Sequence, residues 1–293
     1  MSTYERLESC PSCKNAQSSN YKIIKDHTVS NESFAIVKCE NCSLLFTNPR
    51  PDKNTIGYYY QDKNYISHTN KITNPIHLIY RLARYFTIRY KMHLITKHIP
   101  TGKLLDYGCG TGHFIHYAHS RGFQIDGIEP DKGARVKASA KSVNIFPTID
   151  DLPLKPTYDV ITAWHVLEHV HDIKETFDKL LQLVKPKGFL YIALPNIKSF
   201  DAVHYDTDWA AWDIPKHLYH FSPATFKYFI HSHKLKIHST YPLYLDSYYI
   251  SLLSERNKDS KSSLINAIKI GYLSNKKAKK SNDYSSLIYV IKK

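Results

Sequence analysis

The stretch Leu104-Leu105-Asp106-Tyr107-Gly108-Cys109-Gly110-Thr111-Gly112-His113-Phe114 decides the fold class of this 293-residue chain. A short apolar run ends in an acidic residue, three alternate glycines follow, and a helical pattern then begins. Glycines in such a turn permit positive φ angles and let a ligand approach the backbone without a Cβ atom in the way. The order of strand, glycine turn and helix predicts a ligand site at the carboxyl end of a buried strand.

A second acidic residue strengthens this prediction. Glu129 lies 17 residues after Gly112, at the end of a predicted strand over Gln124–Ile128. A carboxylate there can accept hydrogen bonds from both ribose hydroxyls of an adenosine ligand, although Glu129 could instead be a neighbour of a helix N-cap. The spacing G-x-G-x-G also differs from the G-x-G-x-x-G of dinucleotide sites. Together the two features predict an adenosine-containing ligand.

The surrounding pattern predicts a parallel sheet with helices on both faces, because apolar strand-like runs alternate with helical stretches from Lys103 onward. Before this region, Pro75–Ile99 has apolar residues at helical spacing and predicts an amphipathic helix. The predicted strands are Leu104–Asp106, Gln124–Ile128, Asp159–Ala163, Phe189–Leu194, Leu235–His238 and Ser286–Ile291.

Four of the five cysteines form two identical pairs, Cys10-x-x-Cys13 and Cys39-x-x-Cys42. Two such turns can bring four thiolates together tetrahedrally, as Zn²⁺ requires, and four protein ligands leave no open position for catalysis. The prediction is therefore a structural zinc site, with disulfides or a lost metal site as the alternatives. The fifth cysteine, Cys109, is assigned no redox or metal role.

Two histidines follow the predicted strand Phe189–Leu194, in a segment rich in aromatic residues. His217 and His220 lie just before a helix that Ser222 and Pro223 are expected to begin. A histidine is suited to remove a proton near neutral pH, so both are candidate general bases, and His165 is a third. The alternative is that one of them caps the helix or packs structurally, and His165 could equally order a pocket.

These motifs resemble the class I methyltransferases that use S-adenosylmethionine (SAM), over roughly Lys103 to the end of the chain. The pattern Asp213-x-Pro215-x-His217-Leu218-x-His220-Phe221-Ser222 is similar to one broad branch of small-molecule enzymes. The resemblance implies an α/β fold with a Rossmann-like sheet whose last strand is antiparallel, behind a small N-terminal zinc-ribbon-like module. It makes NAD a poor second choice of cofactor.

The resemblance also implies the cofactor contacts. Asp106 and the glycine turn are expected under the methionine part of SAM, and Glu129 on its ribose. Thr148–Leu152 is expected to reach the adenine, with Asp150 as acceptor and Asp151 as the alternative. Lys187 stands where a second glycine is usual before the strand Phe189–Leu194. The implied cofactor set is Asp106, Gly108, Cys109, Gly110, Gly112, Glu129, Pro130, Asp150 and Trp164.

The predicted organisation has three parts: a zinc module over residues 1–50, a linker with a helix covering the active site over 51–102, and a methyltransferase domain over 103–293. The predicted function is methyl transfer from SAM to a small-molecule acceptor. One alternative is an RNA methyltransferase, although the sequence lacks an aromatic-plus-basic strand for stacking bases and an Asn/Asp-Pro-Pro-Tyr motif. The other is a non-catalytic SAM-binding scaffold.

The formal net charge of +14 permits nucleic acid, an anionic lipid surface or a phosphorylated substrate as partner and does not choose among them. The lysine-rich run Lys276–Lys280 is either a solvated helix face or a polyanion contact. No run of 18 apolar residues occurs, so no membrane span is expected. The start of the chain lacks the apolar core of a secretion signal, which predicts a cytoplasmic protein. The oligomeric state stays open.

Overall fold

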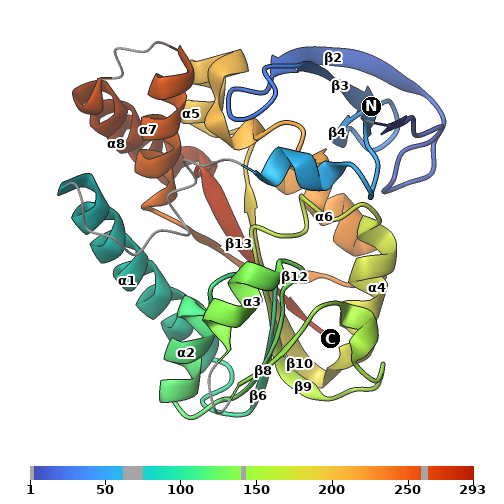
Figure 1. Ribbon diagram of the computed structural model, residues 1–293, viewed down its shortest axis with the longest axis vertical. Helices are drawn as coiled ribbons and strands as arrows, with labels where there is room; N and C mark the ends of the chain where they lie inside the picture. The colour runs from blue at the N-terminus through green and yellow to red at the C-terminus, as the bar shows by residue number, and fades with distance from the viewer. Residues whose placement is uncertain (1–2, 62–74, 140–142, 259–262) are drawn as a thin grey trace. The chain divides into compact units, whose positions relative to one another are not determined.

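The computed structural model describes residues 3–61, 75–139, 143–258 and 263–293 (Figure 1). The chain forms two compact units, each assembled from segments that are distant in sequence. The division into residues 1–50, 51–102 and 103–293 stays a prediction, and residues 62–74 of its middle part lie outside the described residues. Unit 1 contains Met1–Lys63, Leu167–Lys174 and Ala193–Ile288, and unit 2 contains Asn64–Val166, Glu175–Ile192 and Tyr289–Lys293.

A seven-stranded sheet has the order β12-β13-β10-β9-β6-β7-β8. Strand β6 pairs in parallel with β7 and with β9, and β7 pairs in parallel with β8. The predicted Rossmann-like sheet is therefore confirmed, and its strand β8 is an addition to the predicted set. The strands are β6 (Lys103–Tyr107), β7 (Gln124–Ile128), β8 (Val143–Phe146), β9 (Tyr158–Trp164), β10 (Val184–Pro195), β12 (Ile237–Pro242) and β13 (Ser286–Lys292).

The last strand runs antiparallel to β10, as predicted. Within unit 2, the backbone N–H of Lys293 donates to the carbonyl of Gly188 at 3.1 Å. Within unit 1, the N–H of Asn196 donates to the carbonyl of Ser285 at 2.9 Å. Residue numbers therefore rise along β10 while they fall along β13, which defines an antiparallel pair.

In unit 2, α2 (His113–Ser120) packs against β7 and β8, and α1 (Pro75–Thr96) contacts α2. The predicted helix from Pro75 is confirmed, although it ends at Thr96 rather than at Ile99. The other helices are α3 (Lys132–Ala138), which begins at the N-cap Asp131, and α4 (Ile173–Leu183).

Unit 1 has a four-stranded sheet of order β11-β4-β3-β2. Its strands are β2 (Ser18–Lys25), β3 (Ser33–Cys39), β4 (Leu45–Thr47) and β11 (Tyr219–His220), while β1 (Tyr4–Glu5) pairs separately with β5 (Arg50–Pro51). Tyr219 lies opposite Phe46 in the antiparallel β4–β11 pair. The two-residue strand β11, which contains His220, therefore adds the predicted histidine loop to the sheet whose strand β3 ends at Cys39.

The apolar core of unit 1 includes the N-terminal strands and the aromatic segment around residue 210. The indole N–H of Trp209 donates to Asp201, a buried carboxylate that also accepts from the hydroxyls of Ser274 and Ser285. Buried carboxylates need such partners. The core residues include Ile24, Phe34, Ile36, Leu45, Tyr59, Trp209, Trp212, Ile250 and Ile270.

Helices α5 (Phe200–Tyr205), α7 (Asp246–Lys258) and α8 (Leu264–Ser281) pack together in unit 1, and α6 (Pro223–Ser232) begins at the capping box of Ser222 and Thr225. The lysine-rich run lies in the last turns of α8 with its lysines exposed. In the described part of the chain, no helix is long and apolar enough to cross a bilayer.

The glycine turn gives a paired test of backbone strain. A Cβ atom on Gly108 would lie 2.5 Å from a methyl of Val166, whereas one on Gly110 meets no described atom within 4 Å. Both have positive φ angles, so Gly110→Ala should destabilise unit 2 by about 1–2 kcal/mol. Gly108→Ala should add about 1–3 kcal/mol for overpacking. Urea unfolding of the two variants measures the difference, and equal destabilisation would contradict this account of the turn.

Candidate active site

The carboxyl end of β6 places Asp106 inside unit 2. Its side chain is 2% exposed and accepts a hydrogen bond of 2.6 Å from the hydroxyl of Thr162 on β9. Burial raises the pKa of Asp106 to about 7, although the Thr162 hydroxyl and the Lys91 ammonium favour the ionised form. The charge of this carboxyl therefore changes near neutral pH, and a cation beside it would favour ionisation.

The glycine turn joins the ends of two strands. The N–H groups of Gly108 and Cys109 both donate to the carbonyl of Ile128, at 2.8 and 2.9 Å. The φ angles of Gly108, Gly110 and Gly112 are 76°, 54° and 86°, which side chains rarely allow. Gly112 then forms the N-cap of α2. The turn leaves the space around the α-carbon of Gly110 open to a ligand.

Glu129 lies beside this turn, directly after β7. One of its carboxylate oxygens accepts from the N–H of Gly110 at 2.8 Å, and the other accepts from the N–H of Asp131 at 2.9 Å. The residue is half-buried, and Pro130 after it is exposed. Each carboxylate oxygen has two lone pairs, so both can accept a further bond from a ligand hydroxyl.

Two neighbouring carboxylates lie in the short 3-10 helix Ile149–Asp151. Asp150 pairs with the ammonium of Lys179 at 2.7 Å, and Asp151 accepts from the N–H and the hydroxyl of Thr148 at 2.9 Å each. Both residues are exposed. The choice between them as an adenine acceptor stays open, because each is already held by one partner.

The segment after β9 begins with Trp164, whose ring is half-buried. The ring of Phe114 lies 5.3 Å away edge-on, and the ammonium of Lys91 lies 4.4 Å from the Trp164 centroid. His165 follows with a φ angle of 58°. Cys109 in the glycine turn is buried, which raises the pKa of its thiol and keeps it protonated.

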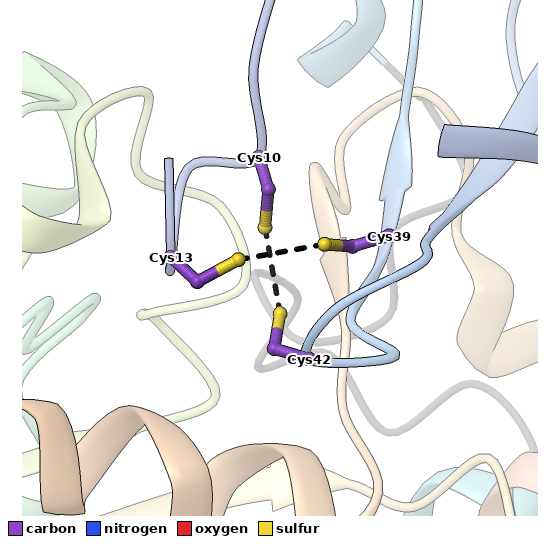
Figure 2. Close-up of side chains that lie close together, drawn as sticks. All are labelled: Cys10, Cys13, Cys39 and Cys42. Atoms are coloured by element: carbon purple, nitrogen blue, oxygen red, sulfur yellow. Dashed lines mark hydrogen bonds between the residues drawn. The ribbon is translucent and has the colours of Figure 1, made fainter. Parts of the chain in front are cut away.

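The four paired cysteines come together in unit 1 (Figure 2). The sulfurs of Cys10 and Cys42 lie 3.5 Å apart, as do those of Cys13 and Cys39. A tetrahedral ion with sulfur ligands at ~2.3 Å needs sulfur separations of about 3.8 Å, close to those observed. All five cysteines are described residues, and none forms a disulfide.

Both cysteine turns have the same backbone structure. The N–H of Lys14 donates to the carbonyl of Cys10 at 2.9 Å, and the N–H of Ser43 donates to that of Cys39 at 3.0 Å. Lys14 and Ser43 have φ angles of 63° and 59°. The hydrogen bond between the two sulfurs lowers the pKa of Cys42 to about 5 and raises the pKa of Cys10. The two turns therefore place the four sulfurs in a geometry that suits a metal ion.

His217 and His220 are buried in unit 1, at 7% and 3% exposure. Nδ1 of His217 lies 2.9 Å from the carbonyl of Ala211, which can only accept, so Nε2 has the lone pair. The hydroxyl of Thr47 donates to the carbonyl of His217, and Nε2 of His220 lies 3.3 Å from the same hydroxyl. His220 therefore donates from Nε2, and its burial lowers its pKa well below the usual value.

Two residues not singled out from the sequence lie beside His217. The ring centroids of His169 and His217 are 4.5 Å apart, and Glu168 is 0% exposed. The adjacent Glu-His pair, a few residues after a strand, was the signal available in the sequence. His217, whose ring lies beside that of His169, is 48 residues further along the chain, and local sequence patterns do not predict contacts over such a separation.

The structure thus brings the predicted residues together in two sets. The predicted SAM-binding residues and His165 belong to unit 2, whereas the four cysteines, His217 and His220 belong to unit 1. Their assignments to cofactor, catalysis and metal stay predictions.

Comparison with known proteins gives the class of the chain. Residues 78–240, more than half of the chain, match a family model described as a methyltransferase domain. The chain therefore belongs to the methyltransferase domain family, and its class is that of the SAM-dependent methyltransferases.

Similar curated proteins are named ubiquinone biosynthesis O-methyltransferases. That of Saccharophagus degradans is 35% identical over 103 residues, which are 32% of this chain and 44% of the relative. That of Vibrio parahaemolyticus is 32% identical over 137 residues, which are 43% of this chain and 56% of the relative. The chain spans about half the length of these relatives.

Solved structures show the same fold. An N-methyltransferase from Burkholderia thailandensis, solved with 1,6-didemethyltoxoflavin and S-adenosylhomocysteine, has a TM-score of 0.50 at 11% identity and covers 92% of this chain and 99% of its own. The cyclase SpnF has a TM-score of 0.50 at 16% identity, covering 70% of this chain and 80% of its own. At these identities the likeness concerns the fold alone.

The raised pKa of Asp106 predicts a pH-dependent stability. The Asp106 carboxyl binds its proton more tightly in the folded protein, where its pKa is about 7, than in the unfolded chain, where it is ~3.9. Its protonation therefore stabilises the fold fully below pH ~3.9, and this stabilisation is lost as the pH rises through about 7. Asp106→Asn should therefore be more stable than the wild type at pH 8, by on the order of 2–4 kcal/mol, and nearly equal at pH 4. Urea unfolding across this range measures the difference, with the exposed Asp150→Asn as control. A difference that does not change with pH would contradict the burial of an ionising group here.

Proposed function

We propose that this chain transfers a methyl group from SAM to a small-molecule acceptor. The observation that supports this best is the arrangement at the ends of β6 and β7, where Asp106, an open glycine turn and the carboxylate of Glu129 come together in a methyltransferase domain. The names of the similar proteins support a small-molecule acceptor, because each names a biosynthetic O-methyltransferase.

The proposed roles in cofactor binding follow from the site geometry. The open space at Gly110 would admit the methionine part of SAM against the backbone, and the charge of Asp106 would respond to the cationic groups of that ligand. The remaining lone pairs of Glu129 would accept the two ribose hydroxyls. Asp150 or Asp151 would accept from the adenine amino group, and Pro130 and Trp164 would flank the cofactor.

Methyl transfer is an in-line displacement, so alignment contributes much of the rate, and a hydroxyl acceptor also needs to lose a proton. The two buried histidines of unit 1 differ at Nε2. In His217 this nitrogen has a lone pair that could accept a proton from an acceptor hydroxyl, whereas in His220 it donates to Thr47. His165 stays a third candidate. A lone pair such as that of His217 can take a proton or bind a cation.

We further propose that the four paired cysteines bind a structural zinc ion. The near-tetrahedral sulfur positions and the twin backbone turns support this, and four protein ligands leave the ion no open coordination position. Cytoplasmic placement, where thiols stay reduced, belongs to the same proposal.

Cofactor binding is tested at Glu129. Removing a charged hydrogen-bond acceptor costs about 1.5–3 kcal/mol, so Glu129→Ala should weaken SAM binding by roughly ten- to a hundredfold. Isothermal titration with SAM measures this, and Glu175→Ala, a carboxylate on α4 paired with Lys179, is the control. Unchanged affinity in a folded Glu129 variant would mean that the ribose lies elsewhere.

Methyl transfer itself is tested with the full chain, SAM and a metabolite extract. Mass spectrometry should detect a small molecule whose mass rises by one methylene unit, with the methyl label derived from labelled SAM. Labelled RNA with no labelled small molecule would favour the RNA alternative, and SAM binding without any labelled product would favour a scaffold.

The zinc proposal predicts about one equivalent of zinc per chain by elemental analysis. Cys39→Ser should lose the ion and lower the unfolding temperature, because the metal joins two turns of unit 1. Cys109→Ser, which changes the cysteine outside the cluster, should keep the zinc. A folded, metal-free wild type with four titratable thiols would overturn the proposal.

A further inference from the structure

We propose that Glu168, His169 and His217 form a second metal site, which binds one divalent transition-metal ion through two imidazole nitrogens and a carboxylate. Each residue offers one ligand atom, and these atoms all lie within 4.8 Å of one another. Glu168 and His217 are buried, at 0% and 7% exposure, and His169 is half-buried. A single ion can reach all three after small side-chain adjustments.

The backbone around the cluster holds the two segments together. The N–H groups of Leu218 and Tyr219 donate to the carbonyl of Glu168 at 2.7 and 3.3 Å. The carbonyl of Lys216 lies 3.1 Å from Nδ1 of His169. The segment after His217 is also held by strand pairing, since Tyr219 and His220 of β11 pair with Phe46 and Leu45 of β4. The three side chains are therefore placed by main-chain bonds rather than by a flexible loop.

The histidine tautomers suit a metal ion. Nδ1 of His169 lies 3.1 Å from the Lys216 carbonyl and 3.0 Å from the Tyr60 hydroxyl, which can also accept its proton, and Nδ1 of His217 lies 2.9 Å from the Ala211 carbonyl. Carbonyls only accept, so each Nδ1 carries the proton and each Nε2 has the lone pair. Metal-binding histidines usually donate their other N–H to a carbonyl or carboxylate, which fixes the ring and strengthens the ligand. Both histidines of the cluster meet this condition.

The charges around the cluster also favour a cation. The carboxylate of Asp213 lies 3.9 Å from Nε2 of His217 and 2.8 Å from the ammonium of Lys216. Glu168, at 0% exposure, adds a second carboxyl group beside the two imidazoles. Burying charge in this way is unfavourable, and a divalent ion at the histidine nitrogens would offset it.

The ligand set identifies the class of ion. Imidazole and carboxylate ligands suit zinc, manganese, iron, cobalt or nickel, whereas four thiolates favour zinc. Three protein ligands leave at least one position open for water or an oxygen atom of another molecule. This site is therefore chemically different from the four-cysteine cluster, and the two can be distinguished in one protein.

The test uses the full chain with its cysteine site loaded with zinc, titrated with Mn²⁺ and followed by electron paramagnetic resonance. Mn²⁺ is a poor match for thiolates, so it reports the second site separately. About one equivalent should bind to the wild type. Glu168→Gln and His217→Asn should each weaken binding at least about tenfold, while His231→Asn, an exposed histidine on α6, should not.

A measurement on the wild type alone covers the case in which a buried variant fails to fold. X-ray absorption or electron–nuclear double resonance of the bound ion should show two nitrogen ligands and no sulfur. Absence of binding by Mn²⁺, Co²⁺ and Zn²⁺ beyond the cysteine site would overturn the proposal, as would an ion without nitrogen ligands. If no ion binds and His217→Asn still lowers turnover, His217 acts as a proton acceptor instead.

Discussion

The hydrogen bond from the Gly110 N–H to the Glu129 carboxylate is the interaction on which the candidate cofactor site depends. It forms because the turn after β6 takes left-handed φ angles, which direct consecutive N–H groups toward the end of β7. Two of these N–H groups satisfy the carbonyl of Ile128, and buried carbonyls need such partners. The ends of β6 and β7, the glycine backbone and the acidic side chain are thus fixed relative to one another by main-chain geometry.

In unit 1, Arg50 has a comparable role. Its guanidinium is 4% exposed and donates to Glu5, to the hydroxyl of Tyr219 and to the carbonyl of His171, at 2.7, 3.1 and 2.9 Å. These partners come from three separate segments, two of which flank the Glu168–His169–His217 cluster. The turn with Cys39 and Cys42 connects β3 and β4 of the same small sheet. The four-cysteine cluster and the histidine cluster are therefore parts of one folded unit.

The sequence was most informative where the determining interactions are local. The turn Gly108–Gly112, the carboxylate of Glu129 and the paired cysteines could all be predicted, because each depends on a few neighbouring residues. Strand β11 could not be predicted, since it has two residues and exists only through its pairing with β4. The core position of Trp209 also depends on distant residues, because Asp201 accepts its indole N–H and the helices of unit 1 surround it. Helices α7 and α8 were not predicted as elements, because their sequence is mixed, although a helix face was one interpretation of the lysine-rich run in α8.

Both units bury acidic groups at positions where a cation would be favourable. In unit 2, burial raises the pKa of Asp106, and a cationic ligand at the strand end would offset that burial. In unit 1, Glu168 and Asp213 lie beside two histidines, and burial lowers the pKa of His169 to about 4, which keeps its ring neutral and able to act as a ligand. A ligand that binds only the folded state adds RT ln(1 + [L]/Kd) to the free energy of unfolding. Cation binding at either position would therefore raise the free energy of unfolding.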